Sequence, residues 1–134
     1  MASLGSQCYA VLTRALLAQG KLHEAKATAD RALDLSQKSG DLTVHFEATL
    51  AAAAVNTELG RVTEARQALE RVRDETSRHG YTNYQLQSRL GLGELELRSG
   101  EVALGRARLR QLQKDAKNRG FLLLSRRAAA NSGT

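Results

Sequence analysis

The sequence predicts an all-α protein built from repeated helical hairpins, and three observations support this fold class. The 134 residues contain no proline, the residue that breaks helices most strongly. Hydrophobic residues make up 42% of the chain but aromatic residues only 4%, which predicts a core of Ala, Leu and Val at close helix spacing. Six glycines recur every twenty residues: Gly20, Gly40, Gly60, Gly80, Gly100 and Gly120. These features exclude a β-rich fold, and the length suits a single domain over 1–134.

The glycine series predicts where each helix ends. Glycine tolerates positive φ values that other residues avoid, so it commonly closes a helix. The expected helices span 7–19, 22–39, 42–59, 62–79, 82–99, 102–118 and 121–130. Paired helices form units of forty residues at 1–40, 41–80 and 81–120, followed by a terminal helix at 121–130. Such a period predicts an α-solenoid, in which antiparallel hairpins bury their apolar faces against their neighbours.

The residues beside the glycines confirm the repeat. In the second helix of each unit, an apolar residue follows the glycine by two places and a small one follows it by five. They are Leu22, Val62 and Val102, and Ala25, Ala65 and Gly105. The small residues predict a close approach between helices. The first helices share an apolar stripe at the same spacing: Leu4, Cys8, Leu12 and Ala15 in one unit, and Val44, Ala48, Ala52 and Val55 in the next.

These units resemble the tetratricopeptide (TPR) repeat, a helix pair with Leu-Gly or Leu-Ala in its first helix, a turn glycine and an alanine five places on. Matching residues are Leu12, Gly20, Leu22, Ala25 and Ala32; then Gly60, Val62, Ala65 and Leu69; then Leu92, Gly93, Gly100 and Val102. The usual period is about 34 residues with a closing proline. The longer period here looks like the long-helix variety of bacterial signalling proteins. The resemblance covers nearly the whole chain and implies a non-catalytic scaffold that binds proteins.

The resemblance also implies that the first helices line a concave groove for a peptide or helix of a partner protein. The corresponding positions are Gln7, Arg14, Glu47, Leu50, Ala54, Glu58, Gln87, Leu90, Glu94, Leu97 and Arg98. We expect the ligand to contact the three leucines and to be fixed by Glu94 and Arg98, while ordinary helix packing of those leucines is an equal alternative. Ala10 and Arg14 replace the Lys and Asn with which some family members clamp a C-terminal carboxylate, so that ligand is not expected.

Positive charge is concentrated near the C-terminus. Residues 97–134 hold nine Lys or Arg and two Asp or Glu, a net charge of +7, whereas residues 1–96 have a net charge of −1. Four of the cations follow one another at steps of four, four and three on the sixth expected helix: Arg106, Arg110, Lys114 and Lys117. This basic stripe suggests an alternative function, the binding of phosphates or nucleic acid. We rank it below protein binding because no aromatic residue is interleaved to stack on bases.

No motif for catalysis, a cofactor or a metal is found. The sequence has no phosphate-binding loop, no His-Glu-x-x-His and no nucleophile elbow. The segment Gly91-Leu92-Gly93 lies within an expected helix and is interpreted as close helix packing. The three histidines, His23, His45 and His79, lack a second ligand at helical spacing and are expected on the surface. Cys8 falls on an apolar stripe and is expected to be a small buried hydrophobic residue.

Cysteine content and apolar run length bear on the compartment. A single cysteine cannot form an internal disulfide, which fits a reducing cytoplasm. The longest apolar run, 50–55, is far too short to span a membrane. The chain starts within a first helix and stops after an unpaired one. We therefore expect either a piece of a longer protein, which is the favoured interpretation, or self-association in which the open ends pair with a second copy.

Overall fold

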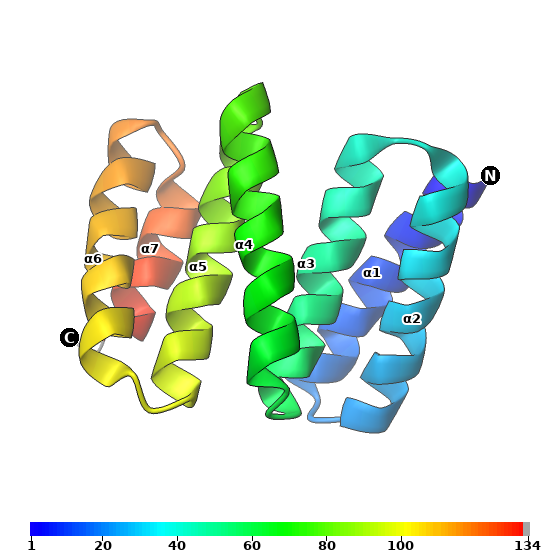
Figure 1. Ribbon diagram of the computed structural model, residues 1–134, viewed down its shortest axis with the longest axis horizontal. Coiled ribbons are helices and arrows are strands. Elements are labelled where there is room, and N and C mark those ends of the chain that lie inside the picture. The colour runs from blue at the N-terminus through cyan, green and yellow to red at the C-terminus, as the bar shows by residue number, and fades with distance from the viewer. Residues whose placement is uncertain (133–134) are drawn as a thin grey trace. The chain divides into compact units, whose positions relative to one another are not determined.

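The computed structural model describes residues 1–132, which form seven α-helices and no strands, as the all-α prediction requires (Figure 1). The helices are α1 (Ala2–Ala18), α2 (Leu22–Ser39), α3 (Leu42–Glu58), α4 (Val62–His79), α5 (Thr82–Arg98), α6 (Val102–Asn118) and α7 (Leu122–Asn131). Six of the seven expected helices agree with the structure to within one residue at each end. The first helix begins at Ala2 instead of residue 7, so the expectation was five residues too short there.

Glycines with a left-handed conformation end the first six helices, as the spacing of twenty predicts. Their φ values lie between 71° at Gly40 and 93° at Gly100. After α1, the Lys21 N–H donates to the Leu16 carbonyl oxygen and the Gly20 N–H donates to that of Leu17. These two bonds form a Schellman motif, which satisfies carbonyl groups that the helix end leaves free. The same pair of bonds closes α3 and α6.

The start of α3 has a side-chain cap. Asp41 precedes α3, and its carboxylate accepts hydrogen bonds from the Thr43 N–H at 3.0 Å and from the Thr43 hydroxyl at 2.9 Å. The Thr43 hydroxyl, followed by the backbone N–H groups, lowers the pKa of Asp41 below its ordinary value. An ionised Asp41 therefore joins the turn at Gly40 to the first turn of α3.

The chain divides into two compact units, 1–68 and 69–134, with the division inside α4. In the first unit, α1, α2 and α3 pack against one another. Alanines dominate this core: Ala32 of α2 packs with Ala10 of α1 and with Ala48 and Ala51 of α3. Small side chains allow the close approach between helices that the repeat predicts.

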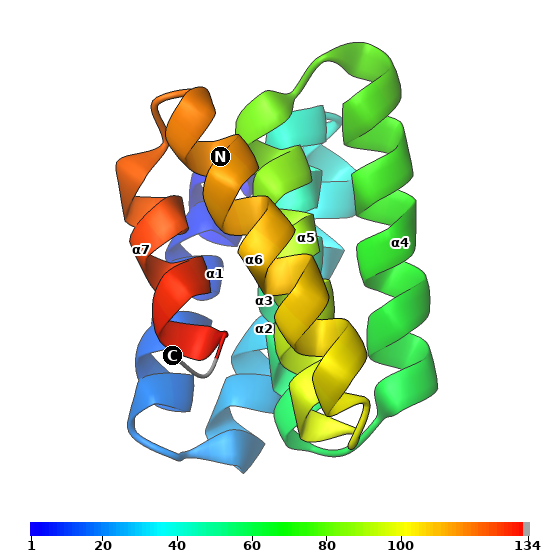
Figure 2. The same cartoon turned by 90° about the vertical axis from the view of Figure 1, so that its left-hand side faces the viewer.

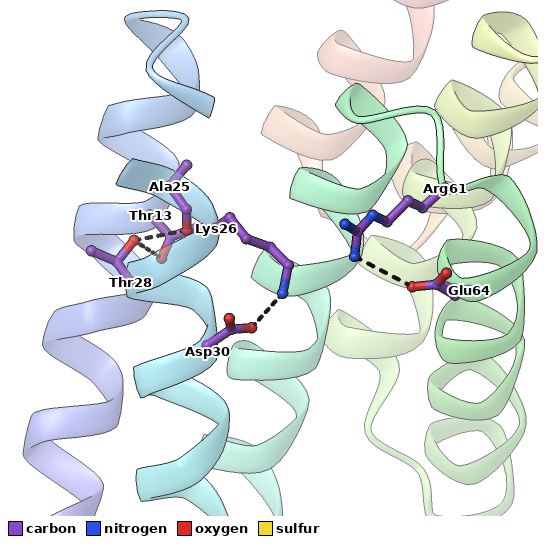
Figure 3. A network of polar contacts seen from close by, with 7 residues as sticks. All are labelled: Thr13, Ala25, Lys26, Thr28, Asp30, Arg61 and Glu64. Carbon is purple, nitrogen blue, oxygen red and sulfur yellow. Dashed lines mark hydrogen bonds and ion pairs between the residues drawn. The ribbon is translucent and has the colours of Figure 1, made fainter. Parts of the chain in front are cut away.

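Polar contacts also join and support helices of the first unit (Figure 3). The hydroxyl oxygens of Thr13 in α1 and Thr28 in α2 lie 2.8 Å apart. Each also lies within hydrogen-bonding distance of a carbonyl oxygen of its own helix. Also on α2, Lys26 pairs with Asp30 at 2.7 Å, where water screens the charges. The buried Thr13 therefore has its hydrogen-bonding capacity satisfied between α1 and α2.

In the second unit, α5 packs on α6, and α6 packs on α7 (Figure 2). Leucines make up most of this core, in contrast to the alanines of the first unit. The buried cluster consists of Leu86, Leu90, Leu109, Leu112, Ala116, Leu124 and Ala128. Leu97 and Phe121 pack against it from its edge.

The glycines inside α5 allow helices to pack closely, as interpreted from the sequence. A Cβ atom at Gly93 would lie 2.5 Å from Leu109 Cδ2, and one at Gly91 would lie 2.7 Å from Leu69 Cδ2. A Cβ atom at Gly105 would lie 3.0 Å from the carbonyl oxygen of Gly93. The segment Gly91-Leu92-Gly93 is therefore a packing feature of this helix.

Candidate functional site

The predicted groove residues lie on α1, α3 and α5, and their exposure separates them into two groups. Polar members are exposed or half-buried: Gln7, Arg14, Glu47 and Glu58 in the first unit, and Gln87, Glu94 and Arg98 in the second. Ala54 and Leu97 are half-buried. Leu50 and Leu90 are buried, at 5% and 3% exposure. The polar members thus lie at the surface, whereas the two leucines do not.

The burial of Leu50 and Leu90 corrects the expectation that a ligand contacts these side chains. Leu90 packs in the leucine core with Leu109 and Leu112 of α6, and Leu97 packs against the same core. Burial of a leucine removes its apolar surface from water, so these residues stabilise the fold. The alternative interpretation, ordinary packing between helices, is the one that the structure supports for Leu50 and Leu90.

Three of the polar candidates lie on α5, the helix that contributes Leu86 and Leu90 to this leucine core. Glu94 accepts a hydrogen bond from the side-chain amide of Asn131 in α7 at 2.9 Å. Gln87 donates to the side-chain oxygen of Asn83, one turn earlier, at 3.2 Å. Arg98 is exposed in the last turn of the helix. The three residues form a mixed polar face, in which Glu94 is oriented by a neighbouring helix and Gln87 by its own.

A buried ion pair that the sequence analysis missed lies in the second unit. Glu96 is fully buried, and both of its carboxylate oxygens accept from the Arg108 guanidinium, Oε1 from Nε at 2.7 Å and Oε2 from Nη2 at 3.0 Å. The bond to Glu96 raises the pKa of Arg108 above its already high ordinary value. The sequence carried one signal: Glu96 occupies the repeat position of Leu16, where an apolar residue is expected.

A second ion pair joins α5 to α6. The Arg89 guanidinium lies 2.6 Å from one carboxylate oxygen of Asp115, and the Gln111 amide donates to the other at 3.0 Å. Hydrogen bonding from Arg89, with a smaller contribution from Gln111, lowers the pKa of Asp115 below its ordinary value. Glu96 and Asp115 are therefore each paired with an arginine, Arg108 and Arg89 respectively, that lies outside the basic stripe.

The basic stripe itself is a surface feature. Its four residues, Arg106, Arg110, Lys114 and Lys117, are all exposed along α6. Their spacing places them on one face of this helix, away from the buried Leu109 and Leu112. Arg126 and Arg127 of α7 are exposed as well. Because no acidic partner covers the stripe in the part of the chain described, its positive charge faces solvent.

Cys8 differs from its expectation. It is exposed on α1, not buried, because no described helix packs over that side of α1. Two histidines, His23 and His79, are exposed as expected, whereas His45 is half-buried. Within residues 1–132, no group of three or more His, Cys, Asp or Glu side chains could hold a metal ion. None of the helices described there is long and apolar enough to cross a membrane.

Comparisons of this chain with models of protein families, with curated proteins and with solved structures gave no match.

Proposed function

We propose that this chain is a non-catalytic, TPR-like interaction module, which binds a segment of a partner protein along the polar face of α5. The observation that carries the proposal is the arrangement on α5. Gln87 and Glu94, both half-buried, and the exposed Arg98 lie on one helix, close to Leu90 in the packed core. A peptide or helix that supplies both a cation and an anion would match this mixed face.

Preorganisation supports this function. Leu90 is buried in the core of the second unit, and Asn131 holds Glu94 from α7. Residues already ordered before binding lose little conformational entropy when the partner arrives. Polar groups held in this way contribute to selectivity among partners, because a mismatched partner leaves them without hydrogen bonds.

A charge-reversal pair tests this proposal. Arg98→Glu alters the proposed face, whereas Arg110→Glu makes the same change at an exposed site on the basic stripe of α6. We expect nuclease-treated cytoplasmic extract to yield a protein partner with the wild-type chain and with Arg110→Glu, and to yield much less of it with Arg98→Glu. Equal capture by all three chains would contradict the proposed face. Both variants must keep the helical circular dichroism of the wild type.

The second candidate function is binding of a phosphate-rich ligand by the basic stripe. The supporting observation is that all four side chains are exposed on one helix face. If the four cations each neutralise one phosphate, the logarithm of affinity falls with the logarithm of salt concentration with a slope of about −3 to −4. A fluorescent oligonucleotide titrated at several salt concentrations measures this slope. Here Arg110→Glu weakens binding and Arg98→Glu leaves it largely unchanged, the reverse of the pattern above.

The proposed setting is the cytoplasm, in a bacterial regulator of which this module is the sensory or assembly part. Support for a reducing compartment comes from Cys8, the single cysteine of the chain, which is exposed as a free thiol. A bacterial regulator is what the resemblance to long-helix TPR proteins implies.

A further inference from the structure

The second helix of each repeat unit carries a charge pattern that changes in the third unit. Four positions, at steps of four, four and three, hold a cation, two acidic residues and an uncharged residue in the first two units: Lys26, Asp30, Asp34 and Gln37 in α2, and Arg66, Glu70, Asp74 and Ser77 in α4. The same four positions of α6 hold the basic stripe: Arg106, Arg110, Lys114 and Lys117. Two cations of α6 therefore stand where both other helices have acidic residues.

The pattern of α2 stabilises its own helix, whereas the basic stripe does not. On α2, the Lys26 ammonium lies 2.7 Å from a carboxylate oxygen of Asp30, one turn later. The corresponding neighbours on α6, Arg106 and Arg110, are both cations, and like charges at this spacing destabilise a helix. Departures from a local rule of this kind are typical of functional sites.

The repeat keeps these positions at the surface even where further helices follow. In α2, Asp30, Asp34 and Gln37 are exposed and Lys26 is half-buried, although α3 follows and packs on this helix. All four residues of the basic stripe are exposed in α6. The register of the repeat therefore directs the basic stripe into solvent, and the packing of one helix on the next does not bury it.

The acidic side chains that bond to arginines at the junction of α5 and α6 lie on another side of α6. Glu96 of α5 pairs with Arg108 at 2.7 Å, and Asp115 pairs with Arg89 of α5 at 2.6 Å. Arg108 and Asp115 thus mark the side of α6 that faces α5, and helical spacing separates them from the basic stripe. The charge of the basic stripe is therefore complementary to an anionic ligand from outside the described structure.

The residues beside the basic stripe favour a polyanion over a segment of an acidic protein. Ala103 and Ala107 lie next to the arginines on the helix surface, and both are exposed. Interfaces between proteins depend on large apolar or aromatic side chains for most of their binding energy, and two alanines supply none. A ligand held by charge alone matches this surface better.

The same surface favours a nucleic-acid duplex over a single strand. Neither α6 nor α7 contains an aromatic residue, and Phe121 between them packs against the leucine core. No ring is therefore offered on these helices for unpaired bases to stack on. A duplex carries one phosphate for about every 1.7 Å of its axis, a higher charge density than that of a single strand.

We propose that the basic stripe binds the phosphate backbone of double-stranded nucleic acid without reading its sequence. This inference rests on the second candidate function above, which it narrows to one ligand, and not on the polar face of α5. The stripe is about 16 Å long, which is the length of about five base pairs. Because α6 packs against α5 and α7, it cannot enter a major groove as a free helix, so it contacts phosphates and not base edges.

Fluorescence anisotropy of a labelled DNA duplex, titrated with the full chain at several salt concentrations, tests the proposal. We expect the logarithm of affinity to fall with the logarithm of salt concentration with a slope of about −3.6, or 0.9 for each of four cations. A duplex of unrelated sequence should bind equally well. One strand of the first duplex should bind more weakly at every salt concentration.

A double variant based on the repeat locates the site. Arg110→Asp/Lys114→Asp gives α6 the charges that α2 has at these positions, so it should fold, and it should weaken binding by at least about tenfold and halve the salt slope. Lys21→Asp/Lys38→Asp is the matched control, because it changes two exposed cations of α2 and lowers the net charge by the same amount, from +6 to +2. The control should keep the salt slope of the wild type.

The possible results separate this proposal from the function on which it rests. Tighter binding of the single strand would overturn the assignment to a duplex but leave phosphate binding in place. Equal losses in the two double variants would overturn the site, since net charge alone would then explain binding. Displacement of the duplex by poly-glutamate at an equal concentration of charges would indicate an acidic protein ligand instead. Absence of binding to either form of DNA at low salt would contradict the second candidate function itself.

Discussion

At the residue scale, the repeat places side chains of different chemistry at equivalent positions. Three residues at intervals of forty lie in the last turns of α1, α3 and α5: Leu16, Asn56 and Glu96. Leu16 needs no polar partner, and Glu96 has Arg108. Asn56 has a buried side-chain oxygen that accepts no hydrogen bond within the described structure. The residue twelve places on decides the outcome, since it is Arg108 after Glu96 but Ala68 after Asn56.

Replacing Arg108, the partner of buried Glu96, should lower the free energy of unfolding. Arg108→Met leaves the fully buried Glu96 carboxylate without its guanidinium. An uncompensated buried charge lowers the free energy of unfolding by about 3 kcal/mol. Chemical denaturation measures this loss, and the double variant Glu96→Met/Arg108→Met should recover most of it because neither charge remains. A single variant as stable as the wild type would show that the pair contributes nothing.

Replacing Asn56 should have the opposite effect. Asn56→Leu removes a buried oxygen that has no partner in the described part of the chain and introduces the residue found at the equivalent position, Leu16. We expect the free energy of unfolding to rise by about 1 kcal/mol. Asn56→Asp is the contrasting variant, because it adds charge at the same site and should destabilise. Destabilisation by Asn56→Leu would indicate that the amide makes a contact essential to the fold.

The Arg89–Asp115 pair should make stability depend on pH in acid. Because Arg89 lowers the pKa of folded Asp115, its stabilising effect is present above the unfolded pKa near 3.8. It disappears as the pH falls through the lower, folded pKa. Arg89→Met should therefore cost about 1 kcal/mol at pH 7, and the difference from wild type should shrink below pH 4. Urea titrations at pH 7, 5 and 3 measure the difference. A gap that stays constant to pH 3 would refute this account.

At the element scale, close packing explains glycines that helix propensity disfavours. Glycine inside a helix costs about 1 kcal/mol relative to alanine. At Gly93 this cost is offset by the contact with buried Leu109, because no Cβ would fit there. The left-handed glycines have a different role: at Gly20 the positive φ directs the chain out of α1, and no neighbouring atom restricts the space there.

Alanine substitutions at two glycines should therefore have different effects on the stability of the protein. Gly93→Ala forces Leu109 out of position in the core, and overpacking of this kind costs about 1–3 kcal/mol. Gly5→Ala brings the new Cβ only to 3.0 Å from the end of the half-buried Leu35 side chain, which can move slightly. The higher helix propensity of alanine should then outweigh this small adjustment, so the stability of α1 should be unchanged or slightly raised. Thermal denaturation of both variants gives the comparison, and equal melting temperatures would contradict it.

At the scale of the whole molecule, charge is distributed unevenly. The chain has a formal net charge of +6, and its C-terminal 38 residues carry more than this net charge. Mutual repulsion among these cations opposes folding at low ionic strength. Their positions matter as well, because Lys117 in the last turn of α6 interacts favourably with the helix dipole.

The effect of neutralising cations of the basic stripe on the melting temperature should therefore depend on which end of α6 is changed. Arg106→Gln/Arg110→Gln and Lys114→Gln/Lys117→Gln each lower the net charge from +6 to +4. The first double variant should raise the melting temperature at low salt, because it relieves repulsion without losing a favourable contact at the helix end. The second should raise it less or lower it. Added salt should reduce the difference, and identical effects of the two variants would argue against a role for the dipole.

The sequence by itself determined the helices of this protein and the turns between them. Helix formation and its termination by glycine depend on neighbours in the chain, so the absence of proline and the spacing of twenty residues were sufficient. Six helices agreed closely with expectation, and the glycines all adopt the predicted positive φ. The exposed polar candidates, such as Arg98 and the basic stripe, also lie on the surface as their residue types suggest.

Tertiary structure decided which apolar stripes are covered. Leu90 and Cys8 both lie on apolar helix faces, yet Leu90 is buried beneath α6 and Cys8 is exposed. Helical periodicity gives the direction of a side chain but not whether another helix lies over it. The Glu96–Arg108 pair likewise required two helices to meet at a particular register. Burial and pairing depend on residues distant in the chain, so only the packed structure could show them.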